Sequence, residues 1–452
     1  MRKLFFLAAT VATFTFALIS CDKTSDAIDA EVSRQKANGK ITYVDNVNVE
    51  IAQAVAEGFY ADASKESSIA YVISIDSIID WEGKTAIYVF NFSPNGFVLT
   101  SADIKNEPII GYSDKGTFSA NANEMPEGLF CLLTETMIVN RWLQEPERER
   151  DVEPQQIIHN NMNNWYDELQ LKKNNLTILL NPDIIIIIDP CDRAPRTLES
   201  TEIQGAFDYY CKTEWGQGEP YNYYAPHYYP AGCVAVAVGQ IMRFHEYPAV
   251  YNTPIPWTTL PNSSNNPYDS MTTGDMYVAA LLRNIGDKVN MNYTSGGSSS
   301  NIDKARKALV KEYGYSENAD VDKFDYNKIK NELQTQKHPL YVRGDGTQTS
   351  WEFWLFVWWT VDEYSDGHAY VIDGVTNLVR TYEYTCMGET KTDKYQTELM
   401  HYNFGWGGSY NFWYSNSIVD VAGTYIDRDV IMDDIMFPNF QYTKKCIYNI
   451  KP

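Results

Sequence analysis

Hydrophobic and polar positions change their period along the chain, and these changes divide the sequence. Apolar residues recur at helical spacing over residues 47–63, and short apolar or alternating segments bounded by turn residues follow, as is typical of strands. Helical spacing returns over residues 127–171, with charged residues in the middle. The pattern predicts an α+β unit of about 150 residues, large enough to form a compact domain. The strand segments are 69–79, 85–92, 96–103 and 108–114.

A second unit begins near residue 200, and in it the predicted helices come first and the predicted strands follow. This order is typical of an α+β domain with an antiparallel sheet. Helical spacing is found at 202–213, 233–245, 274–287 and 301–313. Strand-like segments follow at 339–344, 352–364, 368–377, 381–386, 398–406 and 409–415.

The stretch between the two units, residues 172–200, breaks both periods. It contains three prolines and a run of five isoleucines at 184–188, which we interpret as a strand or a docked linker between domains. Arg193 and Arg196 follow in a Pro-interrupted, exposed connection, the kind of site where proteolytic nicking concentrates. The sequence therefore predicts a cleavable linker here.

The first 20 residues resemble an export signal. Arg2 and Lys3 precede an apolar core that ends in "LISC", residues 18–21. This ending is similar to the bacterial lipoprotein box, in which the cysteine, here Cys21, is lipidated and becomes the new N-terminus; the alternative is an ordinary signal peptide with an incidental cysteine. Residues 21–45 would then tether an exported lipoprotein to its membrane, at the cell surface or facing the periplasm, with release after propeptide cleavage as a further option.

Charge and cysteine content narrow the class of protein. The net charge of −22 argues against nucleic acid or anionic lipid as a partner. The cysteines after residue 21 are few and irregularly spaced, so they predict neither a disulfide scaffold nor a metal site. No cofactor is expected. We assign no role to Cys131, which is predicted to be a core residue, to Cys211, or to Cys191, Cys386 and Cys446, which stand in polar stretches expected to be exposed.

Cys233 is the cysteine whose position in the sequence indicates a chemical role. It follows Pro230-Ala231-Gly232 and begins the segment 233–245, which is apolar on almost every face and is therefore expected to be a buried helix. A cysteine in the first turn of a helix lies near unpaired backbone N–H groups and the positive end of the dipole, and both favour the thiolate. A packed, inert cysteine is the alternative.

A nucleophilic cysteine needs a base, and His368 is the strongest candidate. His368 stands in "SDGHAYVIDG" before a buried strand, 135 residues after Cys233 (368 − 233), within the window of about 130–150 residues known for papain-type enzymes. His245 lies on the same helix as Cys233, three turns away, and cannot reach it. His227 and His401 remain weaker alternatives.

Three more residues complete the predicted site. Asn403, 35 residues after His368 (403 − 368), could orient the imidazole, and Trp406 could shield that contact from water. His401 would point to the same face of the strand and could compete for the orienting role. Gln217, 16 residues before Cys233 (233 − 217), could donate a hydrogen bond to an oxyanion.

These motifs resemble the streptopain family of secreted bacterial cysteine peptidases. The resemblance implies a papain-like fold made as a zymogen, with Cys233 as nucleophile, His368 as general base and acid, Gln217 at the oxyanion hole and Asn403 orienting the histidine. Segment 88–118 resembles the family's inhibitory propeptide. The motifs that carry the resemblance are "WGQGEPYN", "AGCVAVAVGQIMRFHEYP", "VNMNYTSGGSSSNIDKARKAL", "HPLYVRG", "GHAYVIDG" and "NFGWGG".

The chain departs from the family pattern in three places that concern specificity. Phe404 stands where the family usually has Trp after the orienting Asn, and the loop from Gln217 to Cys233 is shorter than in the family. The stretch 347–366 before His368 is unusually aromatic and could reshape the substrate cleft. The resemblance places the mature N-terminus near Thr197 to Thr201. The family's preference for a bulky apolar residue two before the cleaved bond is carried over only loosely.

The expected organisation is a signal peptide, a tether, an inhibitory propeptide that occupies the cleft, a linker and a catalytic domain. The expected function is cleavage of protein or peptide substrates by a cysteine endopeptidase that its own propeptide inhibits. Two alternatives remain: a surface binding protein that retains the fold without catalysis, and a related acyltransferase such as a transglutaminase. The ranges are 1–20, 21–45, 46–171, 172–200 and 201–452.

Overall fold

The computed structural model describes residues 43–44, 47–64, 70–80, 82–121, 125, 127–144, 160–162, 164–165, 168, 179–180, 196–205, 207–251, 253–345, 347–354, 358–365, 367–415 and 443–452. The predictions for the signal peptide, Cys21 and the isoleucine run therefore lie outside the described residues. The chain forms two compact units, one made of Met1–Val44 with Asn175–Ile184 and one made of Asp45–Asn174 with Ile185–Pro452. In the first unit, β1 (Tyr43–Val44) pairs in parallel with β6 (Leu179–Leu180).

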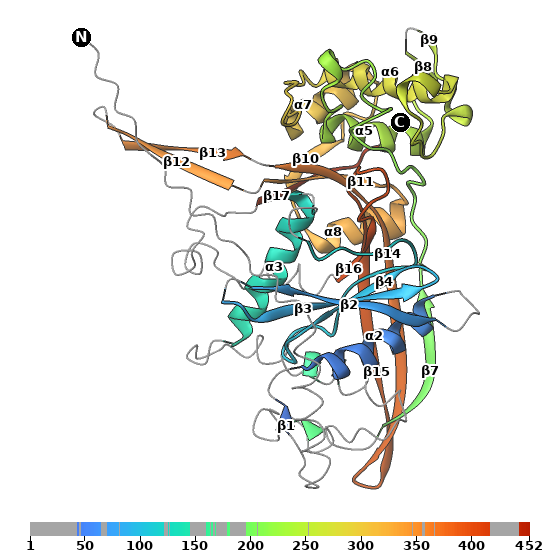
Figure 1. Ribbon diagram of the computed structural model, residues 1–452, viewed down its shortest axis with the longest axis vertical. Coiled ribbons are helices and arrows are strands. Elements are labelled where there is room, and N and C mark those ends of the chain that lie inside the picture. Colours follow the sequence, from blue (N-terminus) through green and yellow to red (C-terminus); the bar gives the residue numbers. More distant parts are fainter. Residues whose placement is uncertain are drawn as a thin grey trace. The chain divides into compact units, whose positions relative to one another are not determined.

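An 11-stranded antiparallel sheet organises the second unit (Figure 1). Its strand order is β10-β17-β11-β14-β15-β16-β5-β4-β3-β2, and β7 pairs with β14 beside this path. Two further pairs, β12 with β13 and β8 with β9, stand apart from this sheet. The strands are β2 (Tyr71–Ile79), β3 (Thr85–Ser93), β4 (Phe97–Ser101), β5 (Ile109–Ser113), β7 (Arg196–Gln204), β8 (Val250–Tyr251), β9 (Thr253–Pro254), β10 (Asp320–Lys323), β11 (Leu340–Asp345), β12 (Thr347–Trp354), β13 (Trp358–Ser365), β14 (His368–Cys386), β15 (Glu389–Asn403), β16 (Phe412–Ser415) and β17 (Thr443–Tyr448).

Helices cover this sheet, in the α+β arrangement that the sequence predicts. The α-helices are α2 (Val49–Ala63), α3 (Glu127–Gln144), α5 (Cys233–His245), α6 (Thr273–Lys288), α7 (Ile302–Lys307) and α8 (Tyr326–Asn331). Short 3-10 helices are η2 (Pro226–Tyr228), η3 (Trp257–Thr259) and η4 (Tyr268–Ser270), and π-helical turns are η5 (Ala308–Glu312) and η6 (Glu332–Gln336). Of the described helices, none is long and apolar enough to cross a membrane.

The N-terminal part of the sheet contains the predicted propeptide strands. Asn48 caps α2 by accepting a hydrogen bond from the N–H of Ile51 at 2.9 Å, and the apolar face of the helix is buried. Strands β2 to β5 form a meander, and β5 pairs antiparallel with β16, Tyr112 opposite Trp413. The propeptide strands thus continue the sheet of the catalytic part, and both predicted domains belong to one compact unit.

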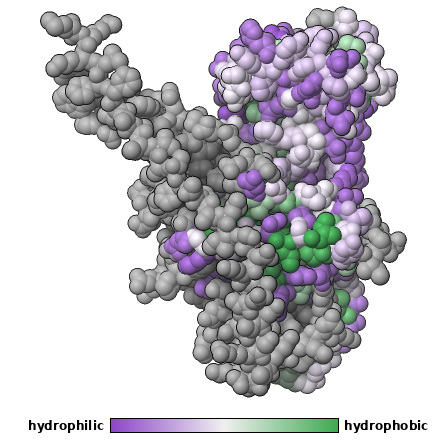
Figure 2. All heavy atoms as spheres, in the orientation of Figure 1, coloured by the Kyte–Doolittle hydropathy of each residue, from purple (hydrophilic) through white to green (hydrophobic). Residues whose placement is uncertain are grey.

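The outer edge of the propeptide sheet is apolar. Strand β2 ends the sheet, and its side chains at Tyr71, Ile73, Ile75 and Ile79 are exposed. Figure 2 shows hydrophobic residues gathered where this strand lies. The surface around the helices α5 to α7 is instead mainly hydrophilic in the same view.

Helix α5 lies in the middle of the catalytic core, as its apolar pattern predicts. It packs against β14 and α6, and its first ten residues are buried. The hydrophobic core around it includes Val238, Ile241, Leu282 and Val371. An all-round apolar helix is stable only in such a position.

One predicted helix differs from the structure. Residues 202–213 are not helical: β7 extends to Gln204, and the backbone N–H groups of Tyr210 and Cys211 bind the carbonyl and carboxylate of Asp373 at 2.9 and 2.8 Å. Those donors are therefore unavailable for a helix. The predicted helical stretch 127–171 is described in part: α3 covers Glu127–Gln144, and residues 160–162, 164–165 and 168 are also helical.

Candidate active site

Cys233 is the first residue of α5, and the residue before it determines how the helix begins. Gly232 is the N-cap, with φ of 93° and no side chain to cap the helix. A Cβ at Gly232 would lie 2.6 Å from Met291 Cε, so a larger residue would require a shift. The backbone N–H groups of the first turn are therefore free of a capping side chain and favour negative charge at the start of the helix.

The thiol of Cys233 differs in pKa from the other free thiols of the described residues. Burial raises its pKa, but the hydrogen bond and charge of His368, the backbone of Ala369 and the charge of Arg343 outweigh burial and lower the pKa to about 7. Burial raises the pKa of Cys446 to about 12 and that of Cys211 well above its usual range. A low pKa is the mark of a reactive cysteine.

The remaining cysteines correct the sequence interpretation in part. Cys446 was expected in an exposed stretch, but it is fully buried on β17, which lies between β10 and β11. The polar residues around it misled that prediction, because alternate residues of a strand point to opposite faces. Cys386, at the end of β14, is disulfide-bonded.

His368 is buried at the start of β14, and two groups contact its Nε2. The backbone carbonyl oxygen of Phe404 lies 2.8 Å from Nε2, and Trp406 Nε1 lies 3.1 Å from it. The carbonyl can accept only from a protonated Nε2, whereas the indole N–H can donate only to an unprotonated Nε2. Because both groups lie at Nε2, Nδ1 is the nitrogen left for the hydrogen bond that lowers the pKa of Cys233.

The side chain of Asn403 is directed to groups other than His368. Its Nδ2 donates to the carbonyl oxygen of Thr213 at 2.8 Å, and its Oδ1 accepts from Gln240 Nε2 at 3.1 Å and from the N–H of Gly405 at 3.2 Å. Within the described residues it makes no hydrogen bond to His368. The carbonyl of the next residue, Phe404, occupies the orienting position instead.

Trp406 contacts the imidazole of His368 itself, whereas the sequence analysis expected it to shield a contact between His368 and Asn403. Its ring centroid is 5.7 Å from that of His368, and the rings are tilted by 33°. Gly405, with φ of 70°, brings this turn against α5, because a Cβ there would lie 2.8 Å from Val236 Cγ1. The turn from β15 to β16 therefore packs directly on the helix of the nucleophile.

Gln217 lies beside the start of α5 through its backbone. Its carbonyl oxygen accepts the N–H of Ala231, two residues before Cys233, at 2.8 Å. Its side chain is half-buried, and it forms no hydrogen bond within the described part of the chain. The backbone of Gln217 is thus held against the residues that precede α5.

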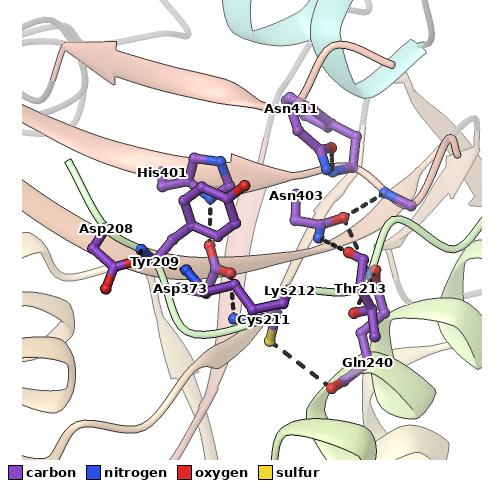
Figure 3. A network of polar contacts seen from close by, with 12 residues as sticks. Asp208, Tyr209, Cys211, Lys212, Thr213, Gln240, Asp373, His401, Asn403 and Asn411 are labelled. Carbon is purple, nitrogen blue, oxygen red and sulfur yellow. Dashed lines mark hydrogen bonds and ion pairs between the residues drawn. The ribbon is translucent and has the colours of Figure 1, made fainter. Parts of the chain in front are cut away.

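The competing histidines have other partners. His401 Nδ1 is paired with Asp373 Oδ1 at 2.6 Å, and its ring stacks on Tyr209 with centroids 3.9 Å apart, as Figure 3 shows. Burial and the neighbouring His338 lower the pKa of His245 to about 4. His227 is in the left-handed region, with φ of 54°, in η2. His401 therefore fixes the segment around Tyr209, and His368 is the histidine that lowers the pKa of Cys233.

Sequence analysis missed three buried polar residues of this region, Thr213, Gln240 and Asp373. All three belong to the network of Figure 3. Only Gln240 had a visible signal, as a polar residue within an apolar helix, seven residues after Cys233. Within the described ranges, no group of His, Cys, Asp and Glu side chains could hold a metal ion.

Two family descriptions match the chain. The Peptidase C10 family matches residues 215–253 and 249–414, a region that contains Gln217, Cys233 and His368. The Spi protease inhibitor description matches residues 44–137.

Individual proteins match the chain at low sequence identity. Streptopain of Streptococcus pyogenes is 23% identical over 369 residues, which cover 71% of this chain and 71% of streptopain. The thiol protease/hemagglutinin PrtT of Porphyromonas gingivalis is 24% identical over 359 residues, 72% of this chain and 33% of that protein. A solved fragment of Prevotella intermedia prointerpain A is 16% identical, with a TM-score of 0.49, and the match covers 84% of this chain and 99% of the fragment.

Proposed function

We propose, since the chain belongs to the peptidase C10 family of cysteine peptidases and carries that family's type of inhibitory propeptide, that it is an exported endopeptidase which cleaves proteins through Cys233. The observation that carries this proposal is the position of Cys233 at the head of α5 with its pKa lowered to about 7 by His368. Cleavage of internal peptide bonds and export go beyond the family assignment.

The reaction would proceed through an acyl-enzyme. The Cys233 thiolate attacks the carbonyl carbon, and the backbone N–H groups at the start of α5, with the amide of Gln217, would stabilise the oxyanion. The His368 imidazolium then gives its proton to the leaving amine, and the S–C bond of the acyl-enzyme remains. In the second half, His368 takes a proton from water, and hydroxide addition releases the carboxylic acid and the thiolate.

One contact at His368 Nε2 can be kept through both protonation states of this cycle. The proton given to the leaving amine comes from Nδ1, the nitrogen assigned to Cys233, so Nε2 stays protonated and donates to the Phe404 carbonyl oxygen throughout. The Trp406 ring packs against the imidazole from the same turn. The ring therefore keeps its orientation while its charge changes.

The propeptide is proposed to keep the full-length chain inactive through a buried polar interface. Arg380 of β14 is fully buried and binds two propeptide acids, Glu168 and Asp62, with Nη2 of Arg380 2.8 Å from Asp62 Oδ2. Lys444 of β17 is buried with Glu135 of α3. Removing one partner of such a pair leaves an unpaired buried charge, which is costly.

The propeptide would inhibit by blocking access of the substrate, because Cys233 and His368 are already assembled as a pair in the full-length chain. The shift in the pKa of Cys233 depends on its hydrogen bond with His368, and it is present while the propeptide strands are still bound. Activation therefore requires removal of the propeptide and no rebuilding of the pair.

Thiol reactivity tests the proposed nucleophile. Brief iodoacetamide treatment of the activated protein at pH 7 is expected to alkylate Cys233 first and to abolish hydrolysis of a protein substrate in proportion. Because the pKa of Cys233 is about 7, its thiolate fraction and alkylation rate should rise about tenfold from pH 6 to pH 8. Peptide mass mapping beside an activity assay measures both. Loss of activity that follows labelling of Cys211 or Cys446 would contradict the assignment.

Two other functions share these residues. A binding protein that retains the fold would show the same structure but no hydrolysis and no activity-linked labelling. A transglutaminase-type acyltransferase would transfer the acyl group to an amine, so added amine would become incorporated into protein. The inhibitory propeptide favours the peptidase, since an enzyme that degrades proteins needs to be made as an inactive zymogen.

A lipid anchor at Cys21 is a further part of the proposal, supported by the "LISC" ending of the apolar core. Cys21→Ser is expected to move the protein from the membrane fraction to the soluble fraction, because the acyl chains attach to this thiol. Immunoblotting of both fractions measures the change, and Ser20→Ala, which leaves the cysteine in place, is the matched control. Identical fractionation of Cys21→Ser and the parent would mean that the signal is cleaved and no lipid is attached.

A further inference from the structure

Gln240 is a fully buried amide in a helix that is otherwise apolar on its buried face. It lies on α5, seven residues or about two turns after Cys233, and hence on a neighbouring part of the same helical face. Nothing in the catalytic reaction uses it directly. Both ends of its side chain are nonetheless engaged, as Figure 3 shows.

The amide of Gln240 closes a ring of hydrogen bonds with two other buried residues. Thr213 Oγ1 donates to Gln240 Oε1 at 3.1 Å, and Gln240 Nε2 donates to Asn403 Oδ1 at 3.1 Å. Asn403 Nδ2 donates back to the carbonyl oxygen of Thr213 at 2.8 Å. Each group has its donor opposite an acceptor, so the orientation of both amides is fixed.

The ring determines where the turn after β15 lies. Asn403 Oδ1 also accepts the N–H of Gly405 at 3.2 Å, which holds the backbone on both sides of Phe404. The Phe404 carbonyl and the Trp406 indole of this turn are the groups that contact His368 Nε2. The position of the imidazole therefore depends on Asn403, and Asn403 depends on Gln240.

We propose that Gln240 is a positioning residue, which joins the helix that carries Cys233 to the turn that holds His368. This inference rests on the proposed peptidase function. Cys233 and His368 come from elements far apart in the sequence, and a hydrogen bond between their side chains needs a fixed distance between those elements. The bond from Gln240 to Asn403 supplies a direct polar link between α5 and the end of β15, in addition to the apolar contact of Gly405 with Val236.

The proposal predicts a catalytic defect in Gln240→Met, which keeps the length of the side chain but removes both hydrogen bonds. We expect kcat for peptide hydrolysis to fall about 10- to 100-fold with KM changed less than about twofold, since small misplacement of catalytic groups has effects of this size. The pH midpoint of Cys233 alkylation should also rise from about 7 towards the value of an ordinary cysteine, because His368 no longer keeps its hydrogen bond to the thiol. Alkylation is measured on the full-length chain, and kinetics after activation by tagged wild-type enzyme that is then removed.

A matched control separates positioning from stability. Val238 lies on the same helix as Gln240 and is equally buried, but its side chain makes no hydrogen bond. The Val238→Ala variant should have a lower melting temperature and an alkylation midpoint that stays near pH 7. If Gln240→Met does not fold, Thr213→Val carries the test, because it removes only the hydroxyl that orients the Gln240 amide. The expected result is then a smaller fall in kcat, about 3- to 10-fold, with an upward shift of the midpoint.

The outcomes distinguish this inference from the proposed function. If the wild type hydrolyses peptides and the tested variant has unchanged kcat and an unchanged midpoint, the positioning role is wrong and the peptidase remains. A midpoint that moves equally in Val238→Ala would also overturn it, since general loosening would then explain the effect. If the wild-type protein itself has no cysteine-dependent hydrolysis, the proposed function fails first.

Discussion

Replacing His368 with alanine is expected to lower kcat/KM for peptide hydrolysis by about three to four orders of magnitude. The variant loses the group that lowers the pKa of Cys233 and the proton donor for the leaving amine at once. Both losses slow the formation of the acyl-enzyme. Steady-state kinetics on the activated protein, with thermal unfolding to verify the fold, measures the effect.

The other histidines and Asn403 give a graded comparison. Asn403→Ala should cost less, about 10- to 100-fold, because it holds the turn of Phe404 and transfers no proton. His227→Ala should leave kcat/KM nearly unchanged. His401→Ala should act on stability, since it removes the buried pair with Asp373. If His227→Ala or His401→Ala reduced the chemical step more than His368→Ala, the base would have been assigned to the wrong histidine.

The second large effect is expected from the propeptide. Full-length protein should hydrolyse protein substrates at less than about one hundredth of the final rate, and activity should appear with a fragment whose N-terminus lies between about 185 and 210. Residues Arg196–Gln204 form β7, an extended strand paired with β14, and its described side chains are exposed apart from half-buried Ile203. Peptidase clefts bind extended chains, so this strand is a suitable substrate once it detaches.

Loosening the buried interface should speed that activation. Glu168→Gln removes a carboxylate that binds the buried Arg380, whereas Asp76→Asn removes an exposed carboxylate from β2 and serves as the matched control. We expect a several-fold faster appearance of the cleaved fragment in Glu168→Gln only. N-terminal sequencing and an activity time course measure both. Full activity in uncut protein, or activation with no cleavage in this window, would defeat the zymogen interpretation.

Local pattern was sufficient for much of this fold, and it failed at residues 202–213 for a non-local reason. The apolar helix at 233–245 and the strands of the propeptide follow from periodicity, because burial there is all-round or alternating. Residues 202–213 have some helical spacing, but their backbone donors bind Asp373, which lies more than 160 residues later. No local signal records such a partner.

The candidate site, too, could be predicted only in part from the sequence. The positions of Cys233 and His368 could be predicted, since each follows from a helix start and a spacing. The sequence also pointed to Asn403 but gave it a direct bond to the histidine. In the structure its side chain bonds to Thr213 and Gln240, and the backbone of Phe404 contacts the imidazole. Backbone carbonyls have no sequence signature, so the contact of the Phe404 carbonyl with His368 could be found only in the structure.

Self-shortening of the purified full-length chain tests the central claim, that Cys233 is the nucleophile of a peptidase zymogen. Under reducing conditions the wild type should convert to a fragment beginning between about 185 and 210 and gain activity on a protein substrate, whereas Cys233→Ala should stay uncut and inactive. Added wild-type enzyme should cut Cys233→Ala at the same place without activating it, which shows that the variant is folded. Self-cleavage and substrate hydrolysis by Cys233→Ala at the wild-type rate would contradict the account.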